Sequence, residues 1–305
     1  MNIRFWGVRG SIPCPGPYTM KYGGNTPCLE LRFKGLDRYI IIDAGSGIRE
    51  LGNHMMAHDL PKGPIKADLF LTHTHWDHIM GFPFFTPIYI PGTQLKIYGP
   101  ATYEDDNLED IIGGQLTYRY FPVRHAELFS QIKYIHLKEG RFDLGDGIML
   151  TTKYLNHPLL CLGYRFEYQG KVLCTAYDTE PFQNIFCTNP DDPCYDEVIA
   201  QEGEQVAMEE NQRIEQFFAG ADLLIHDAQY TLEEYKSSRV GWGHTSFEHA
   251  IAAAKRSQVK RLALFHHDPE RTDVQIDELS KKYCNADCTS NTKVFFAREG
   301  MQIKL

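Results

Sequence analysis

Short apolar segments recur along the chain, separated by polar stretches and by segments of helical spacing. Segment 28–33 alternates apolar and polar residues, which predicts a strand with one buried face. Segments 38–43 and 67–71 are continuous apolar runs, which predict strands buried on both faces. Further strands are expected at 94–98, 148–155, 161–168, 171–176, 222–226, 260–265 and 293–297.

Three segments carry apolar residues at helical spacing: 47–58, 204–219 and 246–257. The last begins with Thr245 and Glu248, which have the spacing of a capping box. Helix 204–219 is expected to have an acidic outer face. Strands and helices follow in roughly the same order in both halves of the chain. This order predicts an α/β fold, a four-layer αββα sandwich of two packed mixed sheets with outer helices.

The chain is expected to form one domain, 1–305, because it shows no linker, short-period repeat or low-complexity stretch. Two segments interrupt the regular pattern. Segment 103–136 is rich in Tyr, Phe and charged residues, and 182–203 carries two prolines and a run of acids. Loops of this length commonly serve as lids or binding loops. For 182–203, a surface insertion without function is an equal alternative.

The composition of the chain limits which kinds of molecule it is expected to bind. The hydrophobic fraction is 43% and the formal net charge is −9, so the chain predicts a packed core and no broad basic surface for nucleic acid. Small or already folded anionic substrates remain open, because a bound metal inverts the local field. The N-terminus lacks an apolar leader, with Ile3 and Phe5 typical of an opening strand, and no apolar run could cross a bilayer. A cytoplasmic protein without membrane contact is expected.

The strand predicted at 67–71 runs directly into His73-Thr-His75-Trp-Asp77-His78. On a strand, positions 73 and 75 project to the same side. The chain must then turn, which brings Asp77 and His78 to a neighbouring point in space. Imidazole and carboxylate groups suit zinc, iron or manganese, and two ligand pairs from one turn suit two adjacent metals.

A site for two metals needs more ligands than these four. Polar residues at the ends of other apolar strands are candidates. His157 follows strand 148–155, Asp178 follows 171–176, and His266 follows 260–265. Each of these strands would deliver its terminal side chain to the same edge of the sheets.

With its intact His-x-His-x-Asp-His string, the chain resembles the metallo-β-lactamase superfamily over essentially its whole length. The resemblance implies two divalent metal ions, with zinc preferred and manganese or iron compatible. Its implied ligand set is His73, His75 and His157 for the first metal, Asp77, His78 and His266 for the second, and Asp178 bridging both.

The bridging Asp178 makes the chain unlike true β-lactamases and similar to the phosphodiesterases, ribonuclease Z enzymes and glyoxalase-type thioesterases of the superfamily. His266 is preferred over His267 because its distance from Pro269 matches the His-x-x-Pro arrangement of the family. Asp43 corresponds to the Asp-x-Gly element, which implies that it orients ligands through hydrogen bonds. A helix-capping role for Asp43 is compatible with this one.

The second half resembles the ribonuclease Z and cyclic-phosphodiesterase branch through Asp227-Ala-Gln-Tyr and Gly243-His244. In that branch a carboxylate at the position of Asp227 pairs with a histidine at the position of His244. Ribonuclease Z enzymes usually carry Glu at the first position, so the shorter Asp227 changes the reach of the pair. Expulsion of an alkoxide from a phosphodiester needs a proton, which makes His244 the natural general acid and Asp227 its orienting partner. An ordinary loop histidine is the alternative for His244.

The N-terminal segments 7–13 and 22–26 also resemble this branch, in particular its bacterial cyclic-nucleotide-phosphodiesterase-like members. Arg9 and Asn25 are therefore candidates for contacts with phosphate or base. Stacking on a base is a further possibility for several aromatic side chains, although packing in the core or in a lid is the simpler role for each. These aromatic candidates are Trp6, Trp76, Tyr118 and Tyr120.

The expected function is a dinuclear-metal phosphodiesterase for a small phosphodiester, with a cyclic nucleotide preferred over tRNA because the chain is acidic and shows no basic, Gly-Pro-rich arm. A ribonuclease Z-like endonuclease is one alternative, and it predicts a basic groove beside the metals. A thioester or lactone hydrolase is another, with little need of His244, and a metal-binding sensor without turnover is a third. The resemblance also implies a homodimer.

Overall fold

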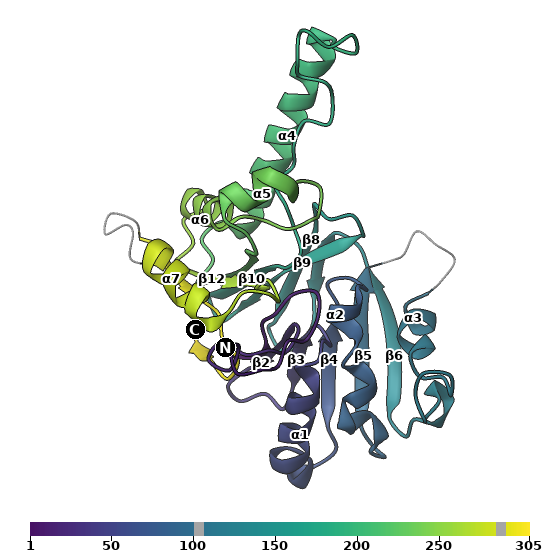
Figure 1. Ribbon diagram of the computed structural model, residues 1–305. Helices are drawn as coiled ribbons and strands as arrows, with labels where there is room; N and C mark the ends of the chain where they lie inside the picture. Colours follow the sequence, from purple (N-terminus) through teal and green to yellow (C-terminus); the bar gives the residue numbers. More distant parts are fainter. Residues whose placement is uncertain (101–106, 285–290) are drawn as a thin grey trace.

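In the computed structural model, which describes residues 1–100, 107–284 and 291–305, the apolar segments form two seven-stranded sheets (Figure 1). The first sheet has the order β14-β1-β2-β3-β4-β5-β6 and the second β13-β12-β11-β10-β9-β8-β7. The strands of the first sheet are β1 (Asn2–Gly7), β2 (Cys28–Arg32), β3 (Tyr39–Ile42), β4 (Lys66–Phe70), β5 (Gln94–Pro100), β6 (Gln131–Leu137) and β14 (Gln302–Lys304). Those of the second are β7 (Gly140–Asp143), β8 (Met149–Leu155), β9 (Cys161–Tyr168), β10 (Lys171–Ala176), β11 (Leu223–Asp227), β12 (Arg261–Phe265) and β13 (Lys293–Phe296).

Helices lie on the outer sides of the two sheets (Figure 1). The α-helices are α1 (Ile48–His58), α2 (Trp76–Ile79), α3 (Leu108–Gly114), α4 (Glu197–Phe218), α5 (Leu232–Ser238), α6 (Phe247–Arg256) and α7 (Asp273–Cys284). Short 3-10 turns are η1 (Leu60–Lys62), η2 (Phe82–Phe84), η3 (Thr86–Tyr89) and η4 (His125–Glu127). Among the described residues, no helix combines the length and the apolarity that a bilayer crossing requires.

Three apolar cores separate the four layers. In β3, Ile42 packs between the two sheets, whereas the neighbouring Ile41 packs with residues of α1. In β11, Ile225 belongs to the core between the sheets and Leu224 packs with α6. Because successive strand residues point to opposite faces, a continuous apolar run serves two cores at once. The predicted αββα sandwich is confirmed.

The strand ends that carry polar residues meet at one edge. Strands β3, β4, β5 and β6 are parallel, as are β10, β11, β12 and β13. Strand β8 pairs antiparallel with β9, which pairs antiparallel with β10, so β8 runs in the direction of β10. The carboxyl ends of β8, β10, β11 and β12 therefore share one edge of the second sheet.

One sequence-based expectation about a helix start is corrected. The N-cap of α6 is Ser246, whose side chain accepts from the backbone N–H of His249, so Thr245 does not form the predicted capping box. Glu248 instead accepts hydrogen bonds from the backbone N–H of Leu232 and the hydroxyl of Tyr283. Both groups come from elements distant in sequence, which a local pattern does not reveal.

The two interrupting segments are more regular than expected. Segment 103–136 contains α3, η4 and the beginning of β6, while its residues 103–106 lie outside the described part. Helix α4 begins at Glu197 because Asp196 caps the backbone N–H of Ile199 at 3.1 Å. The last seven residues of 182–203 are therefore helical.

Residues 182–218 form an arm, in which α4 projects from the body of the molecule (Figure 1). The amide of Asn184 donates to the carbonyl of Ala200 at 2.7 Å, which holds the loop of the arm against its helix. The arm carries nine carboxylates and one arginine. This projecting element is acidic.

Candidate metal centre

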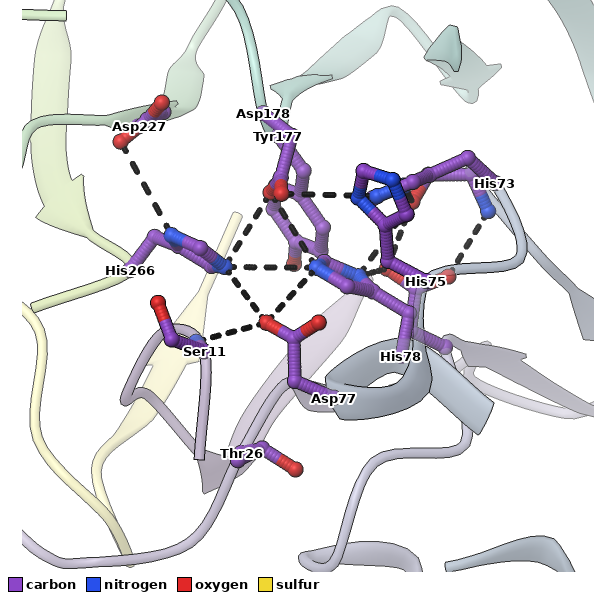
Figure 2. A network of polar contacts seen from close by, with 12 residues as sticks. Ser11, Thr26, His73, His75, Asp77, His78, Tyr177, Asp178, Asp227 and His266 are labelled. Atoms are coloured by element: carbon purple, nitrogen blue, oxygen red, sulfur yellow. Dashed lines mark hydrogen bonds and ion pairs between the residues drawn. The ribbon is translucent and has the colours of Figure 1, made fainter. Parts of the chain in front are cut away.

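The centre is built at the end of β4, where the chain turns into α2. His75 has extended backbone dihedrals and is the N-cap of α2, so the next residues enter a helical turn. Asp77 and His78 are buried on the inner side of that turn, while His73 is fully buried beneath it. The turn thus directs the histidines and Asp77 toward Asp178 and His266 from the second sheet (Figure 2).

One group of four side chains surrounds a first position. His73, His75, His157 and Asp178 offer ligand atoms that all lie within 4.8 Å of one another. Nδ1 of His75 lies 3.1 Å from Nε2 of His157, and Nε2 of His73 lies 3.5 Å from Oδ2 of Asp178. These are the four side chains expected around the first metal, including the shared carboxylate.

A second group lies on the other side of Asp178. The Nε2 atoms of His78 and His266 are 3.3 Å apart, and each lies 3.2 Å from Oδ1 of Asp178. Oδ2 of Asp77 lies 3.1 Å from Nε2 of His266. Figure 2 shows Asp178 connected to ligand atoms of both groups. Its two carboxylate oxygens face different groups, which is the geometry of a bridging ligand.

The polar atoms of these groups fit a cation. Nε2 of His73 and Oδ1 of Asp178 are buried and form no hydrogen bond. Buried polar atoms without partners are costly, and convergent imidazole nitrogens and carboxylate oxygens are the donor set of divalent metals. The donors that converge here therefore suit two adjacent divalent metal ions.

The protonation states of His157, His73 and Asp178 favour ligation. Burial lowers the pKa of His157 to about 4 and lowers that of His73 well below its usual value. Burial by itself raises the pKa of Asp178, but His266 and His78 outweigh it and lower that pKa well below the usual range. Two neutral imidazoles and an ionised carboxylate are thus available, which are the forms that bind metals.

Asp43, directly after β3, orients this centre without entering it. Its carboxylate accepts from the backbone N–H of Thr72 at 2.7 Å and from the hydroxyl of Thr72 at 2.9 Å. It also lies 2.8 Å from Nδ1 of His78, which leaves Nε2 of that ring directed at the centre. A carboxylate behind a ligand histidine fixes its tautomer and ring orientation. No helix cap is formed by its side chain, since α1 begins at Ile48 with Gly47 as N-cap.

Further residues that support the ligand side chains had not been singled out from the sequence. Nε2 of Gln229 lies 2.6 Å from Nδ1 of His266, and the carbonyl of Gly243 lies 3.0 Å from Nδ1 of His157. The backbone N–H of Ser11 donates to Oδ2 of Asp77 at 2.7 Å. Gln229 belongs to the Asp-Ala-Gln-Tyr motif, so the sequence offered a signal for it. The contacts of Gly243 and Ser11 use backbone atoms, which every residue type has, so no sequence signal could have indicated them.

The adjacent histidines 266 and 267 have different surroundings. His266 lies in the second group, while Nε2 of His267 donates to the carbonyl of Ala297 at 2.8 Å. The two rings separate because His266 has a φ of 61°, in the left-handed region. Asp43 (φ 59°) and Asp178 (φ 41°) share this unusual conformation at their own strand ends.

Asp227, the last residue of β11, pairs with His244. Oδ2 of the fully buried Asp227 lies 2.9 Å from Nδ1 of His244, whose side chain is 13% exposed. Burial disfavours the imidazolium, but Asp227 outweighs it and raises the pKa of His244 to about 9. The His244 ring stacks on that of His266 with centroids 5.1 Å apart. The pair therefore places an imidazole with a raised pKa beside the second ligand group.

Comparisons with known proteins agree with this architecture. No family model matches the chain. It is 26% identical to ribonuclease Z of Thermococcus kodakarensis, over 79% of this chain and 78% of that protein. It is 27% identical to ribonuclease Z of Lactococcus lactis subsp. lactis, over 87% of this chain and 88% of the relative. The chain is thus similar to ribonuclease Z enzymes over most of its length.

Solved structures show the same fold at lower identity. The metallo-β-lactamase fold protein YhfI from Bacillus subtilis superposes with a TM-score of 0.64 at 17% identity, covering 99% of this chain and 98% of the other. The short form of human tRNase Z gives 0.61 at 19% identity, covering 100% and 99%. The predicted resemblance to the superfamily, on the ribonuclease Z side, is confirmed, and the chain is a metal-dependent hydrolase.

Arg9 and Asn25, the two candidates for substrate contacts, form hydrogen bonds within the protein instead. Arg9 is fully buried, and its guanidinium donates to the carbonyls of Gly23, Asp268 and Arg271. The expectation that it contacts phosphate or base is wrong, because the side chain ties the N-terminal loop to the loop after β12. The side-chain amide of Asn25 donates a hydrogen bond to Glu299 and accepts one from the hydroxyl of Ser46.

The aromatic side chains considered for stacking on a base differ in their exposure to solvent. Trp6 is only 8% exposed and donates its indole N–H to Glu30 at 3.0 Å, so it cannot stack on a ligand. Trp76, Tyr118 and Tyr120 are exposed. The hydroxyl of Tyr118 donates to Glu127 at 2.6 Å. Of these side chains, Trp76 is the one that lies within the ligand string itself.

Proposed function

We propose that the chain is a dinuclear metal-dependent phosphodiesterase that hydrolyses a small phosphodiester, with cyclic nucleotides as the preferred substrate class. The observation that carries the proposal is the 2.9 Å contact between Asp227 and His244, directly beside the second ligand group. A thioester hydrolase has little need of such a pair, because its thiolate leaving group departs without strong acid assistance.

The residues that would hold the metals are the two groups described above. His73, His75 and His157 would bind one ion, Asp77, His78 and His266 would bind the other, and Asp178 would bridge both. Zinc is the preferred identity, with manganese or iron as alternatives, because the donors are imidazoles and carboxylates. When bound, the ions would supply Lewis acidity toward the phosphate and lower the pKa of a water molecule.

His244 would donate the proton that the departing oxygen needs. An alkoxide is a poor leaving group, so protonation of that oxygen lowers the barrier to cleavage. Asp227 receives the Nδ1–H of His244 and directs Nε2 away from itself, toward the open side of the centre. With a pKa of about 9, the ring is protonated at neutral pH and ready to act as an acid.

Charge favours a small substrate. The formal net charge is −9, and the arm 182–218 carries nine carboxylates against one arginine. A long RNA would meet repulsion along such an arm, since nucleic-acid affinity depends on neutralising many phosphates. A small phosphodiester needs favourable contacts only at the centre itself.

A ribonuclease Z-like endonuclease is the second candidate. It is favoured by the names of the sequence relatives, which match most of this chain. The solved neighbours also include a diphosphatase from the PhnP family, with a TM-score of 0.61 and 16% identity over 100% of this chain and 97% of that one. Enzymes of this architecture therefore include both nucleases and hydrolases of small phosphate compounds.

The deciding experiment measures initial rates of the zinc-loaded protein on 2′,3′- and 3′,5′-cyclic nucleotides, bis(p-nitrophenyl) phosphate and a tRNA precursor. Asp77→Ala and His244→Ala serve as comparison variants. Turnover of a cyclic nucleotide, lost in Asp77→Ala and strongly reduced in His244→Ala, supports the proposal. Efficient cleavage of the precursor without cyclic-nucleotide turnover selects the second candidate. Activity on thioesters or lactones alone overturns both.

A further inference from the structure

Two tryptophans are exposed beside the candidate metal centre. The chain has three tryptophans, and Trp6 is buried, whereas Trp76 is 78% exposed and Trp242 is 55% exposed. An indole presents a large apolar face whose hydration is unfavourable, so exposed tryptophans commonly mark binding sites. Neither the ligand set nor the Asp227–His244 pair uses them.

Trp76 lies between two residues of the ligand string. Its neighbour Asp77 turns inward and is buried, while His75 on its other side is exposed like Trp76 itself. The first helical position of α2 therefore directs this indole outward, at the place where the centre opens to solvent. Trp76 and the ligand candidate His75 are therefore adjacent in sequence and both open to solvent.

Trp242 reaches the same opening from the second half of the chain. The next residue, Gly243, places its carbonyl 3.0 Å from Nδ1 of His157, and His244 follows directly. Nε2 of His157 in turn lies 3.1 Å from Nδ1 of His75. The imidazole rings of His75 and His157 thus connect the backbone segments that carry the two indoles.

The Trp242 segment is held in place. Glu180 accepts hydrogen bonds from the backbone N–H groups of Gly241, at 3.0 Å, and Gly243, at 3.3 Å. The guanidinium of Arg239 lies 4.4 Å from the centroid of the Trp242 ring. Arg239 covers one face of the indole, which leaves the opposite face for a ligand. These contacts favour one arrangement of ring and backbone, and such preorganisation lowers the entropic cost of binding.

Arg239 also adds charge at this opening. Its guanidinium lies 5.7 Å from the ring centroid of Tyr230, whose ring is 6.4 Å from that of His244. Across residues 1–100, 107–284 and 291–305, no carboxylate forms an ion pair with Arg239. An unpaired cation beside two aromatic faces suits a ligand that joins a planar ring to an anionic group.

We propose that Trp76 and Trp242 form an aromatic rim that stacks on the planar group of the substrate, so that the enzyme prefers phosphodiesters of nucleosides over those of aliphatic alcohols. The proposal rests on the phosphodiesterase function and names the substrate class of that site. Stacking accepts any base, because every base has a π-face. The rim therefore selects for a base and discriminates weakly among bases.

A binding measurement tests the rim independently of turnover. Tryptophan fluorescence, excited at a wavelength that nucleotides do not absorb, is recorded during titration with adenosine 5′-monophosphate or with ribose 5-phosphate. The nucleotide is expected to quench the wild type, and ribose 5-phosphate is not. Trp76→Phe and Trp242→Phe each remove part of the quenching, and the double variant, left with buried Trp6, shows none. Equal responses to both compounds in the wild type overturn the proposal.

Kinetics supply the second test. For the p-nitrophenyl ester of thymidine 5′-monophosphate, Trp76→Leu and Trp242→Leu are expected to raise KM by about fivefold or more, with kcat within about threefold. Methyl p-nitrophenyl phosphate carries the same leaving group but no base, so its KM is expected to rise less than that of the thymidine ester. Phenylalanine at either position restores most of the affinity. Phe186→Leu, on the projecting arm, is the matched control.

The two tests separate failure of the rim from failure of the proposed function. Unchanged KM in both leucine variants, with normal turnover of the thymidine ester, overturns the rim and leaves the phosphodiesterase standing. Quenching by adenosine 5′-monophosphate without turnover of any phosphodiester overturns the function and shows a nucleotide-binding rim on a different enzyme.

Discussion

Nδ1 of His244 faces Oδ2 of Asp227 across 2.9 Å, with the carboxylate fully buried and the imidazole open to the centre on its other side. The carboxylate is the final residue of β11, so the sheet itself fixes its position. The Asp side chain is thus long enough for direct contact with the imidazole. This arrangement makes the role of His244 testable through the leaving group.

Replacing His244 with Ala is expected to slow hydrolysis of phosphodiesters with alkoxide leaving groups by about 10²–10⁴-fold. Esters of p-nitrophenol should lose less than about tenfold, because p-nitrophenolate departs without a proton. The measurement is kcat across a series of leaving groups of rising pKa, for wild type and variant. A uniform loss over the whole series would contradict the assignment of His244 as general acid.

The pH dependence follows from the same pair. A general acid works in its protonated form, and Asp227 outweighs burial to raise the pKa of His244 to about 9. The rate with alkoxide leaving groups is therefore expected to hold through neutral pH and to fall as the pH rises through about 9. Asp227→Asn removes the charge that raises this pKa and should move the alkaline limb to lower pH. An alkaline limb that does not move in Asp227→Asn would assign it to another group.

Metal content distinguishes the bridging carboxylate from a ligand of one group. Asp178 belongs to both groups of side chains, whereas His157 belongs to the first. Asp178→Ala is expected to lower occupancy at both positions, and His157→Ala at one. Elemental analysis after dialysis reads the zinc bound per chain. Asp146→Ala, whose side chain is 52% exposed and lies apart beside Arg38, is the control with two ions retained. Two ions retained by Asp178→Ala would exclude a bridge.

Asp43→Asn tests a residue that acts through His78. The amide keeps the size of the side chain but loses the negative charge that faces Nδ1 of His78 and the N–H of Thr72. Zinc affinity is expected to fall by about 10–100-fold. Competition with a chelator measures this loss, and circular dichroism checks that the fold persists. Unchanged affinity would restrict Asp43 to shaping the turn after β3.

The ends of apolar strands carried most of what could be predicted about the site. His157, Asp178 and His266 each follow such a strand, and parallel strands deliver their terminal residues to one edge. The pairing of Asp227 with His244 was suggested by the resemblance alone, since nothing in their spacing requires contact.

Other features depend on tertiary contacts that no local pattern encodes. Thr245 and Ser246 are equally good caps by residue type, and Glu248 is drawn to Leu232 and Tyr283 instead of its own helix end. Arginine is a residue type that often binds phosphate, but the side chain of Arg9 is enclosed by backbone carbonyls of two loops. The expected homodimer and single domain stay predictions, which light scattering and cooperative unfolding would test.

The left-handed backbone conformations of Asp43, Asp178 and His266 imply a trade-off at the strand ends between the stability of the fold and the placement of functional side chains. Such a conformation costs a residue other than glycine about 1–3 kcal/mol. Glycine at position 178 would relieve that strain but remove the carboxylate that both ligand groups share. Selection for thermal stability alone would therefore favour loss of this carboxylate. A more thermostable variant should therefore keep these three residues and carry its stabilising substitutions in the outer helices.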